Sequence, residues 1–138
     1  MTRFPKSGSR DVALILDTNA ISALSVQDDA LLNILEPGAE LCVTVVNAAE
    51  YFYGIQSSRK RTLLSRWFAE FLESVEILNL NREVFPFYHV IRTELRMAGT
   101  PIPANDLWTA SLARLHGMKV VSRDLHFDRV KGLERVAW

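Results

Sequence analysis

The sequence has too little cysteine for a disulfide-stabilised fold and no apolar run long enough for a membrane span. Its single cysteine, Cys42, has no intrachain partner and lies in the apolar run 41–43, where a lone cysteine is usually a small core residue. No apolar run approaches the ~20 residues that cross a bilayer. We therefore expect no membrane contact, and a location in the cytoplasm, where disulfides are not needed.

The sequence also lacks an excess of charge of either sign. Sixteen basic and sixteen acidic residues cancel, so there is no overall basic footprint of the kind that binds nucleic acid nonspecifically. An RNA substrate stays compatible with this balance, because acids gathered in one pocket would leave the remaining surface net positive. Local basic clusters occur at residues 59–61 and at Arg92 with Arg96, although solvated helix surface explains them equally well.

Length and composition predict one globular domain. The 138 residues are 49% hydrophobic, which suffices for a core and is too apolar for a disordered chain. No internal repeat, low-complexity segment or linker interrupts them. Residues 1–10 carry three basic residues with no apolar segment after them, so we expect a flexible tail there rather than a signal peptide. Residues 11–138 are expected to form the domain.

Short apolar runs alternate with helical patterns along the chain. The predicted strands are residues 11–16, 41–45, 75–78 and 119–122, with a short fifth strand at 134–137. Residues 17–19 can cap the next helix, and Asn47 can cap the helix that continues to residue 53. The predicted helices are residues 28–35, 47–53, 59–75, a long segment ending at 98, and 107–115. Pro86 lies inside the long pattern, so that helix either begins near it or is kinked there. This alternation predicts a parallel sheet with helices on both faces.

Four carboxylates lie just past predicted strands or in the helices that follow them. They are Asp17, Glu50, Asp106 and Asp124. Because the carboxyl ends of parallel strands share one edge of the sheet, we expect the four to come together. Four carboxylates cannot all stay ionised at close range without a compensating cation. The pattern therefore predicts a Mg²⁺ or Mn²⁺ site with oxygen ligands.

Each of these acids also has an ordinary structural explanation. Asp17 and Asp106 could cap the helices that follow them, and Asp124 could be a turn residue. Glu50 lies among apolar residues where one helix face should be buried, but its side chain could point to solvent. The metal site is favoured because four separate acids fall at the same edge of one inferred sheet.

Further polar residues flank the acids. Thr18, Asn19 and Ser122 are candidates for hydrogen bonds to a carboxylate or to a substrate phosphate. Asp128 shares a loop with Asp124, and we expect it to support the site from outside or to lie at the surface. His126 in the same loop is expected to be a surface or loop-packing residue, because the other candidate ligands are all oxygen donors.

The residues described so far resemble the PIN-domain nucleases, and most closely the VapC toxins of bacterial toxin–antitoxin pairs. The resemblance covers residues 12–138 and rests on four stretches in the same order. These are LILDTN (14–19), VVNAAEYFYG (45–54), IPANDLWTA (102–110) and VVSRD (120–124). One departure is Tyr51-Phe52, which stands where VapC proteins usually have a leucine after the glutamate.

The resemblance implies a three-layer α/β/α sandwich with a mostly parallel sheet of about five strands. It implies a Mg²⁺- or Mn²⁺-dependent endoribonuclease that acts as the toxin of the pair, is a homodimer, and is inhibited by a VapB-type antitoxin. The substrate class would be structured RNA, either tRNA or ribosomal RNA, cleaved by metal-activated water. Catalysis and metal binding would both fall to Asp17, Glu50, Asp106 and Asp124.

Three other functions compete with this interpretation. A phosphatase with an aspartate nucleophile after the first strand would need a second acid two residues on, where Asn19 stands. A PIN-fold scaffold that binds RNA or a protein without cutting would not need all four acids. A PIN nuclease that is not a toxin is the third alternative, and a small antitoxin-like reading frame beside the gene would distinguish a toxin from it. If an antitoxin exists, exposed apolar residues between Tyr51 and Phe71 are its expected docking surface.

Overall fold

The structure is a computed structural model that describes residues 13–138. The predicted tail, residues 1–10, lies outside the described residues. In chain order the elements are β1 (Ala13–Leu16), α1 (Thr18–Ser25), α2 (Asp29–Ile34), β2 (Glu40–Thr44), α3 (Val45–Ile55), α4 (Arg61–Glu73), β3 (Glu76–Leu78), α5 (Phe85–Met97), α6 (Ala104–His116), β4 (Lys119–Val121), the 3-10 helix η2 (Leu125–Arg129) and β5 (Arg135–Val136). Within residues 13–138, no helix has the length and apolar character needed to cross a membrane.

The five strands form one parallel sheet in the order β3-β2-β1-β4-β5. The central strand β1 is buried along its whole length, which explains its continuous apolar sequence. From β1 the chain first builds β2 and β3 on one side, and then crosses to build β4 and β5 on the other. The carboxyl end of β1 is therefore the topological switch point, where open α/β sheets bind their ligands.

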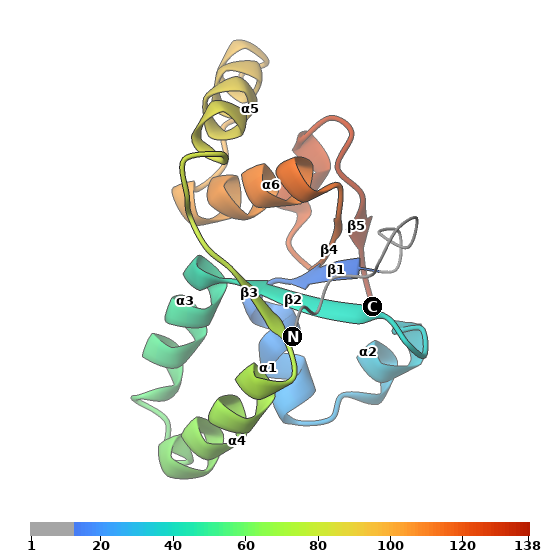
Figure 1. Cartoon of the computed structure of the whole chain (residues 1–138), viewed down its shortest axis with the longest axis vertical. Coiled ribbons are helices and arrows are strands. Elements are labelled where there is room, and N and C mark those ends of the chain that lie inside the picture. Colours follow the sequence, from blue (N-terminus) through green and yellow to red (C-terminus); the bar gives the residue numbers. More distant parts are fainter. Residues whose placement is uncertain (1–12) are drawn as a thin grey trace.

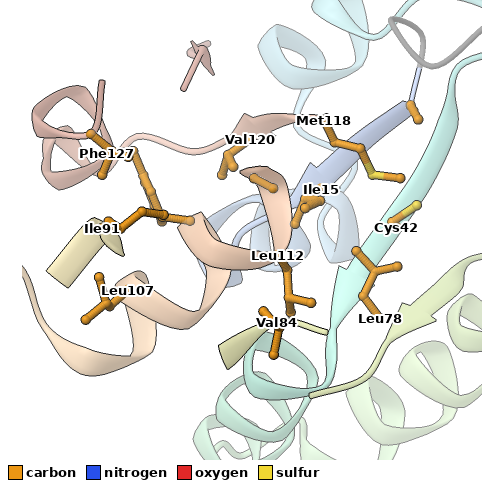
Figure 2. Close-up of a cluster of buried hydrophobic side chains, with 14 of the residues drawn as sticks. Ile15, Cys42, Leu78, Val84, Ile91, Leu107, Leu112, Met118, Val120 and Phe127 are labelled. Carbon is orange, nitrogen blue, oxygen red and sulfur yellow. The ribbon is translucent and has the colours of Figure 1, made fainter. Parts of the chain in front are cut away.

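Helices cover both faces of the sheet, so the predicted α/β/α class is confirmed. Figure 1 shows α5 and α6 on one face, and α1, α3 and α4 on the other. Alternate residues of β1 serve the two layers, since Ile15 packs toward α5 and α6 while Leu14 and Leu16 pack toward α1, α3 and α4. Figure 2 shows the first of these clusters, with labelled members that include Cys42, Leu78, Ile91, Leu112, Val120 and Phe127.

The observed starts of α3, α5 and α6 determine where the polar residues near them lie. Pro86 lies in the first turn of α5, so the helix begins beside it and no kink is needed. The prediction that Asn47 caps α3 is wrong, because Thr44 is the cap and its side chain accepts a hydrogen bond from the Asn47 backbone N–H. The predicted start of the next helix at Leu107 is also wrong. Helix α6 begins at Ala104, which puts Asp106 inside its first turn.

Candidate metal centre

The structure brings the four predicted acids to the carboxyl edge of the sheet. Asp17 directly follows β1 and Asp124 follows β4, while Glu50 lies in α3 and Asp106 in the first turn of α6. Burial is the main cause that raises the pKa of Asp17 and of Asp106; the charges of Asp124 and Glu50 add to the shift of Asp17, and those of Asp124 and Asp17 add to the shift of Asp106. Asp17 is therefore close enough to Glu50, Asp106 and Asp124 for their charges to interact.

Asp17 is the buried member of the group, with 5% of its surface exposed. Asn47 Nδ2 donates to its Oδ1 at 3.0 Å, and Ser122 Oγ donates to its Oδ2 at 2.7 Å. Burial raises the pKa of this carboxyl, and the Ser122 hydrogen bond partly opposes the shift. Asp17 occupies the N-cap position of α1, but its side chain makes no capping hydrogen bond. Helix capping therefore does not explain this residue.

Asn47 donates a hydrogen bond to Asp17 and is itself almost completely buried. Its amide oxygen accepts hydrogen bonds from Thr44 Oγ1 at 2.8 Å and from Thr109 Oγ1 at 3.3 Å. Two hydroxyl donors on one side of the amide fix its orientation, so the NH₂ group faces Asp17. This role of Asn47, and that of Thr109, was not apparent from the sequence. The sequence offered one sign of it. Asn47 stands three positions after Thr44, which is the spacing between an N-cap residue and the backbone N–H that its side chain binds.

Glu50 lies at the exposed rim of the site. Thr18 Oγ1 donates to its Oε1 at 2.6 Å, and Asn105 Nδ2 donates to its Oε2 at 3.0 Å. The glutamate thus points outward and is held by residues of α1 and α6. Its position is fixed by hydrogen bonds rather than by burial.

Asp106 and Asp124 converge on His126. The imidazole Nδ1 lies 2.9 Å from Asp106 Oδ2 and 2.9 Å from Asp124 Oδ1. Burial raises the pKa of Asp106 to about 6, with the contact to His126 opposing the shift and the Asp124 charge adding to it. His126 therefore lies between two of the predicted acids, and the prediction of a surface or loop-packing histidine missed these contacts.

The flanking residues Asn19 and Ser122 tie the ends of β1 and β4 together. Ser122 Oγ accepts from the Asp124 backbone N–H at 2.9 Å and from Asn19 Nδ2 at 3.4 Å, in addition to its bond to Asp17. Asn19 Oδ1 accepts from the backbone N–H of Arg123 at 3.3 Å. These contacts set the spacing between Asp17 and Asp124.

Asp128 lies farther out and forms a two-point ion pair with Arg135, at 2.9 and 3.1 Å. The guanidinium lowers the pKa of the Asp128 carboxyl. Arg135 also donates to the backbone carbonyl of Ser122 at 3.1 Å. Asp128 is thus connected to the carboxylates through Arg135, a residue that sequence analysis did not single out.

The donor atoms present fit a divalent cation. Among residues 13–138, Asp106, Asp124 and His126 form the one group of acids, histidines and cysteines whose ligand atoms all lie within 4.8 Å of one another. Carboxylate oxygens suit Mg²⁺ and Mn²⁺. Asp17 and Glu50 adjoin this group, with oxygens that accept hydrogen bonds from Asn47, Ser122, Thr18 and Asn105.

Known proteins share both the sequence pattern and the fold. The family described as PIN domain matches residues 14–133. Ribonuclease VapC2 of Rickettsia felis is 30% identical over 129 residues, covering 90% of this chain and 96% of the relative. The tRNA(fMet)-specific endonuclease VapC of Salmonella typhimurium is 26% identical over 101 residues, 72% of this chain and 76% of that protein. The crystal structure of VapBC2 from Rickettsia felis bound to a promoter DNA fragment superposes with a TM-score of 0.82 at 28% identity, covering 91% of this chain and 98% of the other.

Proposed function

This chain belongs to the PIN-domain family, with VapC ribonucleases among its relatives, and on that premise we propose that it is the metal-dependent endoribonuclease toxin of a toxin–antitoxin pair. The observation that carries the proposal is the convergence of four acids at the switch point of the sheet, two of them with ligand atoms at metal-binding separation. A scaffold that only bound RNA would not require this concentration of mutually repelling charge.

Some side chains of the site would hold a cation, and others would position the reactants. Asp106 and Asp124 present the converging oxygens, and Asp17 adds a buried carboxylate that Asn47 and Ser122 keep in place. When bound, a divalent cation lowers the pKa of a water ligand and neutralises charge on the scissile phosphate. Glu50, exposed at the rim, is placed to bind the cation or to orient the attacking water.

The polar neighbours keep these groups in position. Thr18 and Asn105 hold the Glu50 carboxylate from two sides. Asn19 and Ser122 fix the β1–β4 edge, where a substrate phosphate would approach. Asp128 stabilises this edge through its ion pair with Arg135. Such supporting contacts matter because small displacements of metal ligands reduce activity strongly.

The proposed substrate is a structured cellular RNA, tRNA or ribosomal RNA, cleaved with Mg²⁺ or Mn²⁺. The name of the Salmonella relative, a tRNA(fMet)-specific endonuclease, supports tRNA as the first class to test. This substrate places the site of action in the cytoplasm.

The proposed protein partner is a VapB-type antitoxin, as in the VapBC2 complex of Rickettsia felis. Phe52 and Tyr53 on α3 and Leu63 on α4 leave 50%, 83% and 63% of their surfaces exposed, and these two helices pack together. Exposed apolar groups of this kind suit an amphipathic antitoxin helix. The double variant Tyr53→Asp/Leu63→Asp should lose antitoxin binding in a pull-down while keeping ribonuclease activity.

A homodimer is proposed from the same family resemblance. Light scattering of the purified chain should give twice the 15.6 kDa of one protomer. A single-protomer mass at micromolar concentration would contradict the dimer without touching the nuclease proposal.

Toxin activity is tested by controlled expression in bacterial cells. Expression of the wild-type chain should arrest growth, and co-expression of the adjacent antitoxin gene should relieve the arrest. Asp17→Asn should abolish the arrest, whereas Asp29→Asn, which alters an exposed acid on α2, should preserve it. Normal growth with soluble wild-type protein and no antitoxin would contradict the toxin proposal.

A further inference from the structure

His126 is held in place by its own loop and by the core beneath it. The backbone N–H of His126 donates to Asp124 Oδ1 at 2.9 Å, which closes the turn that begins η2. The next residue, Phe127, is completely buried in the cluster of Figure 2 and anchors η2 against α6. The imidazole therefore reaches Asp106 and Asp124 from a rigid support.

The contacts of the ring require a proton or a cation between its nitrogen and the carboxylate oxygens. Nδ1 lies 2.9 Å from Asp106 Oδ2 and 2.9 Å from Asp124 Oδ1. A nitrogen lone pair facing two carboxylate oxygens at that distance is repelled, unless a proton, on Nδ1 or on a carboxyl, or a metal ion lies between them. Either a proton or a metal ion can therefore lie between Nδ1 and the two carboxylates, and the two have to be distinguished.

The separations suit three neighbouring ligands of one ion. Two ligands at right angles, each about 2.1 Å from an octahedral cation, lie about 3.0 Å apart. The two nitrogen–oxygen distances of 2.9 Å are close to that value, and all three ligand atoms fall within 4.8 Å of one another.

We propose that His126 is a nitrogen ligand of the divalent cation at this centre, and that it makes the site prefer Mn²⁺ over Mg²⁺. The inference rests on the metal dependence in the proposed function. Mg²⁺ takes oxygen ligands almost exclusively, whereas imidazole binds divalent transition metals well. A site of acids alone discriminates little between the two ions, and one histidine shifts the balance toward Mn²⁺.

Pulsed electron paramagnetic resonance of Mn²⁺ bound to the full chain tests the ligand directly. The wild-type protein should show hyperfine coupling from a directly bound ¹⁴N nucleus, and labelling of histidine with ¹⁵N should change the pattern accordingly. His126→Gln should lose the coupling, while His89→Gln, which alters an exposed histidine on α5, should retain it. Mn²⁺ bound without nitrogen coupling, or no Mn²⁺ binding at millimolar concentration, would overturn the inference.

Equilibrium titrations with Mn²⁺ and Mg²⁺ test the preference. The ratio of the Mg²⁺ and Mn²⁺ dissociation constants should fall at least about tenfold in His126→Gln and stay unchanged in His89→Gln. Equal ratios in wild type and His126→Gln would overturn the inference even if the variant were less stable.

The same experiments separate this inference from the proposed function. RNA cleavage without nitrogen coupling would refute the histidine ligand and leave the nuclease in place. Nitrogen coupling and Mn²⁺ preference in a protein that cleaves no RNA would refute the nuclease and leave the ligand in place.

Discussion

Replacing Asn47 tests whether the buried amide holds the Asp17 side chain in place. In Asn47→Ala, Asp17 loses the donor at 3.0 Å and keeps Ser122, while the Thr44 and Thr109 hydroxyls lose their shared acceptor. A hydrogen bond to a charged group contributes about 1.5–3 kcal/mol. With the lost acceptor included, we expect a decrease of about 2–4 kcal/mol in the free energy of unfolding.

This loss converts into a measurable shift in melting temperature. An unfolding entropy of about 2.1 cal/mol/K per residue gives roughly 0.29 kcal/mol/K for a chain of this length. The Tm of Asn47→Ala should therefore fall by about 7–14 °C in calorimetry without metal. Asn33→Ala, at an exposed position on α2, should shift it little.

Asn47→Asp distinguishes a charge effect from lost packing. It preserves the shape of the side chain but replaces the donor with a second carboxylate beside Asp17. At pH 7 the loss should exceed that of Asn47→Ala, and below about pH 5 part of it should return as the new acid takes up a proton. A double-mutant cycle of Asp17→Ala with Asn47→Ala should show a coupling of at least about 1 kcal/mol. An Asn47→Ala protein as stable as wild type, or a coupling near zero, would refute the role assigned to Asn47.

Three further expectations concern pH, metal and the core. The pKa of Asp106 is raised from 3.8 to about 6 in the folded state, so folding takes up a proton between these pH values. The metal-free Tm should therefore fall as the pH rises from 4 to 6. Asp106→Asn should flatten this slope, and a wild-type slope in the variant would contradict the expectation. Added Mn²⁺ should raise the Tm by mass action, because binding at 100 times Kd adds about 2.7 kcal/mol to the free energy of unfolding. The rise in Tm should be smaller for Asp106→Asn and Asp124→Asn, and equal rises in all three proteins would place the ion elsewhere. Leu112→Ala, in the centre of the cluster of Figure 2, should cost about 2–5 kcal/mol in urea unfolding yet leave the Mn²⁺ dissociation constant unchanged, and a large change in that constant would contradict the separation of core and site.

Those features of the fold that depend on local pattern were predictable from the sequence. The run 13–16 is apolar at every position because β1 is covered on both faces, and that signal requires no knowledge of its neighbours. Pro86 left two alternatives, and the start of α5 beside it settled them in favour of a helix start. The strand ends in turn predicted where Asp17 and Asp124 would lie.

The contacts of the site depend on tertiary geometry and were less accessible. Asn47 has the residue type of a helix cap, and its inward orientation is decided by the capping of α3 at Thr44 and by the packing of α6 through Thr109. His126 meets Asp106 across 20 residues of sequence, and η2 is too short to show a periodicity. The sequence alone therefore does not reveal that His126 contacts Asp106.

The measurement that tests the central claim most directly is cleavage of total cellular RNA by the purified chain with Mn²⁺. EDTA, Asp17→Asn and the matched variant Asp29→Asn would be run in parallel. We predict discrete fragments with wild type and Asp29→Asn in the presence of metal, and none with EDTA or Asp17→Asn. Undiminished cleavage by Asp17→Asn or in EDTA, or intact RNA with folded, antitoxin-free wild-type protein, would contradict the assignment of the carboxylate edge as a metal-dependent ribonuclease site.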